Sequence, residues 1–208
     1  MYSTNTFHFS DFGLIQDLPR LLPQQHLSSI TSLEILWTFD NDPSLFIGRV
    51  GDGLDSLWAD PTRQDSSLHR VCSMVPRSFP HVRSLYISFQ NSINPPVTGA
   101  QGDGISRVES VILGPVEEML RSLEPGPSKE FNVAVTRNLW WLLRDKYNRL
   151  YGSKFRVELD DGLAWGRFWK SLDCSNSQEG DHVDSFGYWV CSGLDDLSLC
   201  NFRVTSLL

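Results

Sequence analysis

Apolar and polar residues alternate in several short runs of this chain, and two of the runs are nearly the same. Residues 28–39 read SSITSLEILWTF and residues 80–89 read PHVRSLYISF, with a serine before the first leucine in both. Alternation with a period of two is typical of β-strands. The matched positions are Ser32, Leu33, Ile35 and Trp37 in the first run and Ser84, Leu85, Ile87 and Phe89 in the second.

The same reading along the whole chain predicts an alternation of strands and helices. Period-two runs predict strands over residues 7–9, 33–37, 85–89, 131–135 and 155–159. Apolar residues at spacings of three and four predict helices over residues 14–22, 67–74, 106–123 and 138–151. Gly152 directly follows the last of these helices and is a suitable residue to cap it.

Strands that alternate with helices favour a parallel sheet built from right-handed crossovers. We therefore expect an α/β fold in which the first four predicted strands lie side by side in one largely parallel sheet, with helices packed on it. The matched leucines, Leu33 and Leu85, are 85 − 33 = 52 residues apart, whereas regular leucine-rich repeats recur every 20 to 29 residues or so. The sheet should accordingly be an irregular leucine-rich-repeat-like one, with long loops at 40–55, 90–104 and 124–129.

The first ninety residues resemble a domain of unknown function that is widespread in filamentous fungi. The resemblance rests on YSTNTFHFSDFGLIQDLPRLLPQQHLSSITSLEILW, residues 2–37, and on FPHVRSLYISF, residues 79–89. It implies an F-box-type protein with degenerate leucine-rich repeats, a family with no established activity. Members usually carry a helical segment before the first strand, whereas Met1 stands directly before Tyr2 here. Either the chain is truncated or this member has lost that segment, which would have to hold any F-box.

Composition and charge narrow the class of protein. With 208 residues, 40% of them hydrophobic and 21% charged, the chain has the make-up of one globular domain, residues 1–208. A net charge of −7 argues against a surface that coats nucleic acid or anionic lipid. No apolar run approaches the roughly 20 residues of a membrane span. Four scattered cysteines and no glycosylation sequon favour an intracellular location, cytoplasmic or nuclear.

No motif in the sequence predicts a phosphate, calcium or zinc site. The glycines of GAQGDGISRVES are followed by no lysine, and Asp103 stands among them. The stretch DNDPSLFIGRVGD begins like a calcium loop but has Leu45 and Gly51 where glycine and an acidic ligand are needed. The remaining cluster matches no zinc pattern, and we expect its cysteines to pack in the core. That cluster is Cys174, Cys191, Cys200 and His182.

Catalytic motifs are also missing from the sequence. It contains neither G-x-S-x-G nor H-E-x-x-H, and its histidines have no nucleophile at motif spacing. We expect no enzymatic activity, no catalytic residue and no cofactor, although an active site assembled from distant residues stays open. The histidines are His8, His26, His69, His81 and His182.

The distribution of charge is the one unusual feature. Residues 137–170 hold eight of the 18 basic residues against four acids, and residues 171–208 hold six acids against Arg203. The basic residues are Arg137, Arg144, Lys146, Arg149, Lys154, Arg156, Arg167 and Lys170. They are interleaved with aromatic residues, namely Trp140, Trp141, Tyr147, Tyr151, Phe155, Trp165, Phe168 and Trp169.

Two interpretations of this basic aromatic block are open. Cations and aromatic rings together can bind nucleic acid by neutralising phosphates and stacking bases. Alternatively, the aromatic rings belong to the core, the charges are solvated, and the acidic segment 171–208 packs on the domain or trails from it. We favour the second interpretation. The sequence therefore predicts a non-enzymatic protein–protein interaction module, with a nucleic-acid binder as the alternative and with no membrane or metal partner.

Overall fold

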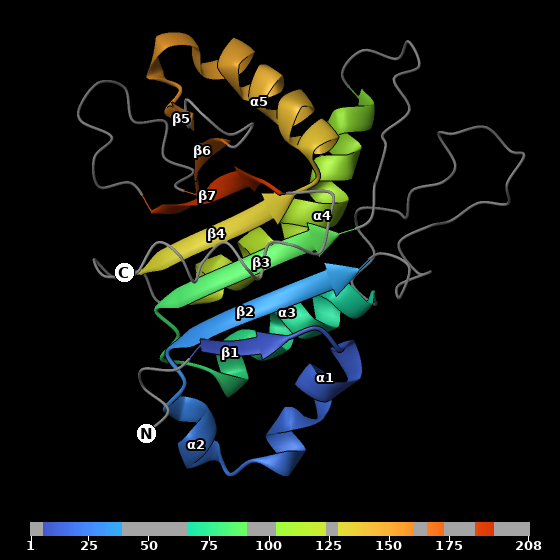
Figure 1. The fold of residues 1–208 in the computed structure, drawn as a ribbon, viewed down its shortest axis with the longest axis vertical. Helices are drawn as coiled ribbons and strands as arrows, with labels where there is room; N and C mark the ends of the chain where they lie inside the picture. Colours follow the sequence, from blue (N-terminus) through green and yellow to red (C-terminus); the bar gives the residue numbers. More distant parts are fainter. Residues whose placement is uncertain are drawn as a thin grey trace, which may run out of the picture.

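In the computed structural model, residues 6–38, 66–90, 103–123, 129–159, 166–172 and 186–193 are described. Within these ranges the strands form one seven-stranded sheet in the order β1-β2-β3-β4-β7-β6-β5 (Figure 1). Strands β1 to β4 and β7 are parallel to one another, and β5 and β6 are antiparallel to their neighbours. The strands are β1 (Thr6–Phe9), β2 (Ser32–Thr38), β3 (Ser84–Gln90), β4 (Glu130–Val135), β5 (Val157–Leu159), β6 (Gly166–Ser171) and β7 (Gly187–Ser192).

The two similar sequence runs are neighbouring strands, paired in the register in which their sequences align. Strand β2 pairs with β3 so that Leu33 lies opposite Leu85 and Ile35 lies opposite Ile87. Trp37 lies opposite Phe89 in the same ladder. The repetition therefore places like side chains in rows across the sheet, and the prediction of four adjacent strands in a largely parallel sheet is confirmed.

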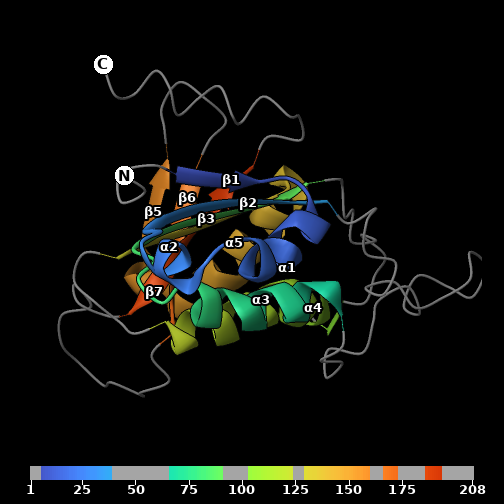
Figure 2. The same cartoon turned by 90° about the horizontal axis from the view of Figure 1, so that it is seen from below.

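The helices cover one face of this sheet. The helices are α1 (Phe12–Leu21), α2 (Gln24–Ser28), α3 (Ser67–Ser78), α4 (Asp103–Ser122) and α5 (Arg137–Tyr151), followed by a 3₁₀ turn, η4 (Gly152–Lys154). Figure 2 shows α1 to α4 below β1, β2 and β3, and the buried residues of α5 belong to the same hydrophobic core. We call the opposite face, on which no helix of the described residues lies, the helix-free face.

Local signals account for several helix ends. The carboxylate of Asp11 accepts a hydrogen bond from the amide of Gly13 at 2.7 Å and so caps α1. The hydroxyl of Ser66 caps α3 in the same way. Helix α5 ends at Gly152, whose φ of 56° lies in the left-handed region that glycine adopts without strain. The predicted cap at this residue is confirmed.

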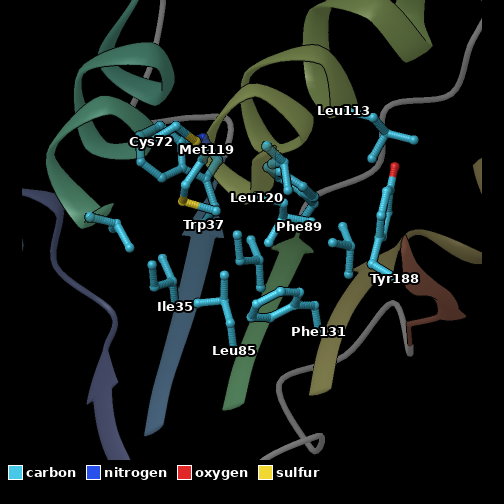
Figure 3. Close-up of a cluster of buried hydrophobic side chains, with 14 of the residues drawn as sticks. Ile35, Trp37, Cys72, Leu85, Phe89, Leu113, Met119, Leu120, Phe131 and Tyr188 are labelled. Atoms are coloured by element: carbon cyan, nitrogen blue, oxygen red, sulfur yellow. The ribbon is translucent and has the colours of Figure 1, made fainter. Parts of the chain in front are cut away.

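The core lies between the sheet and the helices. Leu33, Leu85 and Phe131 form one row on the helix-covered face of the sheet, and all three are almost completely buried. Figure 3 shows Leu113, Met119 and Leu120 above these strands, with Cys72 on the side of Met119 and Tyr188 next to Leu113. Cys72 is buried and free, as expected for a core cysteine, and burial raises the pKa of its thiol far above the usual range.

Two strands and one helix were not predicted. Strand β6 contains the charged residues Arg167 and Lys170, so its sequence suggested a polar segment rather than a strand. Strand β7 is a continuous apolar run, and its sequence shows no alternation. Such a run is typical of a strand covered on both faces, and every residue of β7 is buried. The described part of the acidic segment 171–208 is thus an interior strand between β4 and β6. Helix α2 is only five residues long, too short to give a helical period.

The observed end of α3 differs from the predicted one because the helix continues through a proline. The prediction ended α3 at residue 74, but the helix continues through Pro76 to Ser78. Helix α4 likewise contains Pro115. Since proline removes one backbone hydrogen bond, burial of the apolar faces of both helices must outweigh that loss. None of the described helices is long and apolar enough to span a membrane.

Truncation of Leu85 tests the position of the core. This side chain is 1% exposed, so we expect Leu85→Ala to lower the free energy of unfolding by about 2–5 kcal/mol through lost burial and a residual cavity. The measurement is urea denaturation followed by circular dichroism. Leu150→Ala is the matched control, because Leu150 is 63% exposed on α5 and its loss should change stability by less than about 0.5 kcal/mol. Equal effects of the two substitutions would contradict the assigned face of β3.

Candidate interaction surface

The structure divides the basic aromatic block 137–170 between the two faces of the sheet. On the helix-covered side, Lys146 and Lys170 turn towards two carboxylates of α4, those of Glu109 and Glu117. On the helix-free side, Arg156 and Arg167 lie over the indole ring of Trp189. The block is therefore not one continuous basic surface.

A buried ionic cluster links α4 to α5, β6 and β7. The ammonium group of Lys170 forms ion pairs with Glu109 and, at 2.5 Å, with Glu117 Oε1. Lys146 Nζ lies 2.5 Å from Glu109 Oε2. Two tyrosine hydroxyls complete the cluster: that of Tyr147 donates to Glu109, and that of Tyr188 donates to Glu117 at 3.0 Å.

Electrostatics within this buried ionic cluster shift several pKa values. Burial alone would raise the pKa of Glu109, but the charge of Lys170 and hydrogen bonds from Lys146, Lys170 and Tyr147 outweigh it and lower this pKa. Burial, followed by the negative charge of Glu109, raises the pKa of Tyr147. Burial and the charge of Glu117 raise the pKa of Tyr188. Glu109 therefore stays charged at neutral pH, and the two tyrosines stay protonated and act as hydrogen-bond donors.

Many aromatic rings of the block are core residues, as we expected. Trp140 is 2% exposed, and its indole nitrogen donates to the carbonyl of Val190 at 3.0 Å. Tyr147 stacks on Phe168 with ring centroids 5.5 Å apart. A Cβ atom on Gly166 would come within 2.8 Å of the Trp140 ring, so glycine permits this close approach. Trp141 is an exception, because it is 42% exposed and carries the guanidinium of Arg144 at 4.6 Å.

The helix-free face carries a transverse row of polar and aromatic side chains. Successive strand pairings place one member of the row on each of the six strands β1, β2, β3, β4, β7 and β6. At one end, His8 Nδ1 lies 3.5 Å from Glu34 Oε2. At the other end, Trp169 meets Trp189 edge to face at 5.3 Å. In sheet order the row is His8, Glu34, Tyr86, Asn132, Trp189 and Trp169.

Exposure varies along this transverse row. Asn132 and Trp189 are buried, and Trp189 forms a second small hydrophobic cluster with Ala134 and Cys191 on the helix-free side. Tyr86 and Trp169 are half-buried and pack against that cluster. The side chain of His8 is 39% exposed. The row therefore combines a buried aromatic centre with polar groups that reach the surface.

An arginine–tryptophan cluster lies at the β5 end of the row; it consists of Arg156, Glu158, Arg167 and Trp189. The guanidinium carbons of Arg156 and Arg167 lie 4.6 Å and 4.2 Å from the centre of the Trp189 ring. Both guanidinium groups also bind the carboxylate of Glu158. Hydrogen bonds and charge from Arg167 and Arg156 outweigh the opposing effect of burial and lower the pKa of Glu158.

The other sequence features give no further site among the described residues. The phosphate-like glycines Gly99 and Gly102 and the calcium-like Asp40 and Asp42 lie outside the described ranges, as do Cys174, Cys200, His182 and the six acids of segment 171–208. Cys191 is buried, and its thiol lies 3.9 Å from Asn132 Oδ1. Of the remaining histidines, His69 is bonded through Nδ1 to the hydroxyl of Ser66 at 2.7 Å. In the ranges that the structure describes, no group of three His, Cys, Asp or Glu residues could hold a metal ion.

Sequence reasoning missed both the buried ionic cluster and the transverse row. Glu109 lies one turn before the buried residues Ile112 and Leu113, so a charge within an apolar stripe was an available signal for the first. The row depends on the pairing of β7 with β4 and β6, and β7 was not predicted as a strand. Comparison of the chain with protein-family models, with curated proteins and with solved structures finds no match.

The buried ionic cluster should make stability depend on pH. A lowered pKa in the folded state contributes stability above the ordinary glutamate pKa of about 4.3, and this contribution is lost as the pH falls through the folded-state value. At pH 7, Glu109→Gln should lower the free energy of unfolding by about 3 kcal/mol, the lower end of the cost of breaking a buried ion pair. The reason is that it removes the carboxylate paired with Lys146 and one of the two carboxylates paired with Lys170. The difference between wild type and variant should shrink towards pH 3.

Denaturation midpoints measured across this pH range provide the test. Glu118→Gln serves as the control on the same helix, since Glu118 is exposed and its substitution should shift stability by less than about 0.5 kcal/mol at every pH. A difference between wild type and Glu109→Gln that stays constant from pH 7 to pH 3 would count against the ion pairs.

Proposed function

We propose that this protein is a non-enzymatic protein–protein interaction module that contacts its partner through the helix-free face of the sheet. The observation that carries the proposal is the transverse row, which spans six strands from His8 to Trp169. Tyrosine and tryptophan are the residues that contribute most to binding energy in protein interfaces, usually beside polar groups that give specificity.

The arrangement of the elements supports this choice of face. Strands β1 to β4 are adjacent in the sheet in the order of the sequence, and the helices between them cover the other face. Repeat proteins with strands stacked in this way use an extended sheet surface for binding. We accordingly propose that β1 to β4 form an irregular leucine-rich-repeat-like unit. We further propose that the chain is an intracellular member of the fungal F-box-associated family that its first ninety residues resemble.

Binding of nucleic acid through residues 137–170 is the second candidate, and one observation favours it. Guanidinium groups stacked on an indole, as at Trp189, can bind phosphates and bases. The positions of the lysines weigh against it, because Lys146 and Lys170 are paired with the carboxylates of α4. We therefore rank it below a protein partner.

Site-specific photocrosslinking tests the proposed face. With p-benzoylphenylalanine in place of Tyr86, ultraviolet irradiation in a fungal extract should give a discrete protein adduct, because that position lies in the middle of the row. The same probe in place of Trp141, which is exposed on the helix side, should not give this adduct. Crosslinks that form only from position 141 would move the interface to α5, and mass spectrometry of the adducts identifies the partner.

Salt-dependent binding distinguishes the two candidates. A phosphate-binding surface releases counterions, so its affinity falls steeply between about 50 and 200 mM salt. For a protein-binding module, we expect fluorescence anisotropy to detect no sub-micromolar binding of a mixed-sequence single-stranded oligonucleotide. If such binding occurs and is abolished by Arg144→Glu with Arg149→Glu in a folded protein, the nucleic-acid candidate takes precedence.

A further inference from the structure

The arginine–tryptophan cluster holds a carboxylate between two guanidinium groups. Arg156 Nη2 lies 3.1 Å from Glu158 Oε1, whereas Arg167 binds Oε2 through Nη2 at 2.6 Å and through Nε at 2.7 Å. Each guanidinium thus takes one oxygen of the same carboxylate. Glu158 shows the geometry with which this arginine pair binds an acidic group.

The indole of Trp189 fixes the position of both guanidinium groups. Cation–π contact with an aromatic face restricts the long arginine side chain before any partner arrives. Because ordering such a side chain on binding normally costs free energy, a group that is already placed binds with less loss. The two guanidinium groups are therefore already in position to donate hydrogen bonds to a further anion, unlike freely rotating side chains.

Arg156 is the accessible member of the cluster. Its side chain is 59% exposed, compared with 38% for Glu158 and 28% for Arg167. Within the described residues its guanidinium has one hydrogen-bond acceptor, Glu158 Oε1. A guanidinium carries five N–H donors in a planar fork. Several donors of Arg156 therefore remain available to a group that approaches from solvent.

We propose that the arginine–tryptophan cluster binds a carboxylate from an acidic segment of the partner protein, with Arg156 as the main donor. This inference rests on the proposed function, because the cluster adjoins the transverse row at Trp189. It adds the chemistry of the partner, which carries aspartate or glutamate where it reaches the β5 end of the sheet.

The charge of Glu158 favours a carboxylate over a phosphate. Repulsion between an incoming anion and Glu158 grows with the charge of that anion, and a phosphate monoester carries nearly two negative charges at pH 7. A carboxylate carries one. Glu158 also competes with the incoming carboxylate, so its removal should strengthen binding.

Nuclear magnetic resonance of the side chains tests the proposal directly. The probe is a capped hexaglutamate peptide, and the signals are Arg156 Nε–H and Trp189 indole N–H, the latter assigned with Trp189→Phe. We expect both signals to shift in a saturable manner, whereas a capped hexaglutamine peptide should leave them in place. Arg156→Gln should weaken the binding of hexaglutamate about two- to fivefold, the range for one exposed charge pair.

Two further variants make the test specific. Glu158→Gln should tighten the binding of hexaglutamate about two- to fivefold, because it removes the competing carboxylate. Arg149→Gln is the matched control, since Arg149 is an exposed arginine on α5, and it should leave the binding unchanged. An equal loss with Arg149→Gln and Arg156→Gln would reduce the effect to net charge and overturn the proposal.

The remaining outcomes separate this inference from the proposed function. If hexaglutamate causes no shift while the crosslink from position 86 still forms, the proposed interaction surface is retained and the proposal of an acidic partner is rejected. If a phosphoserine peptide or a single-stranded oligonucleotide shifts the same signals at lower concentrations than hexaglutamate, the ligand is a phosphate and the proposal is wrong. Loss of the crosslink with saturable binding of hexaglutamate would retain the anion site and reject the wider interface.

Discussion

The pairing of Lys170 with Glu109 and Glu117 is the interaction that joins the antiparallel part of the sheet to helix α4. Lys170 lies on β6 with 10% of its side chain exposed, directly beneath the α4 residues that neutralise it. An unpaired ammonium group at this depth would cost several kcal/mol. The two carboxylates of α4 therefore allow β6 to pack against this helix. In doing so they help to position the antiparallel strands next to the parallel ones.

The same pairing explains why the described cations of residues 137–170 do not gather on one basic surface. Lys146 and Lys170 face α4, whereas Arg156 and Arg167 face the other side of the sheet. Alternation along β6 alone separates Arg167 from Lys170, because residues three apart on a strand point to opposite faces. A segment that is continuous in sequence thus supplies two unrelated environments: a neutral interior and a cationic aromatic surface.

Sequence patterns were sufficient for the parallel part of the fold and insufficient for the rest, and the reason is the range of the interactions. Strands β2 and β3 have one covered face and one more polar face, so their alternation was visible and their place side by side could be predicted. In β7, Trp189, Val190 and Cys191 are buried on opposite faces, so no alternation distinguished that strand. The partner of Lys170 lies 61 residues away at Glu109, beyond any local pattern. The transverse row could not be predicted for the same reason, since it forms only when β7 joins β4 to β6.

The position of β7 has a consequence for the order in which the chain can fold. Synthesis proceeds from the N-terminus, so β1 to β4 leave the ribosome well before residues 187–192. Until β7 arrives, the edge of β4 keeps unpaired backbone groups, Tyr188 is not yet available to Glu117, and β6 has no parallel sheet to join. An unpaired strand edge invites association with other chains. Of the strands that the structure describes, the last to be synthesised is thus the one that closes the middle of the sheet. Before it arrives, the nascent chain exposes a strand edge that favours aggregation.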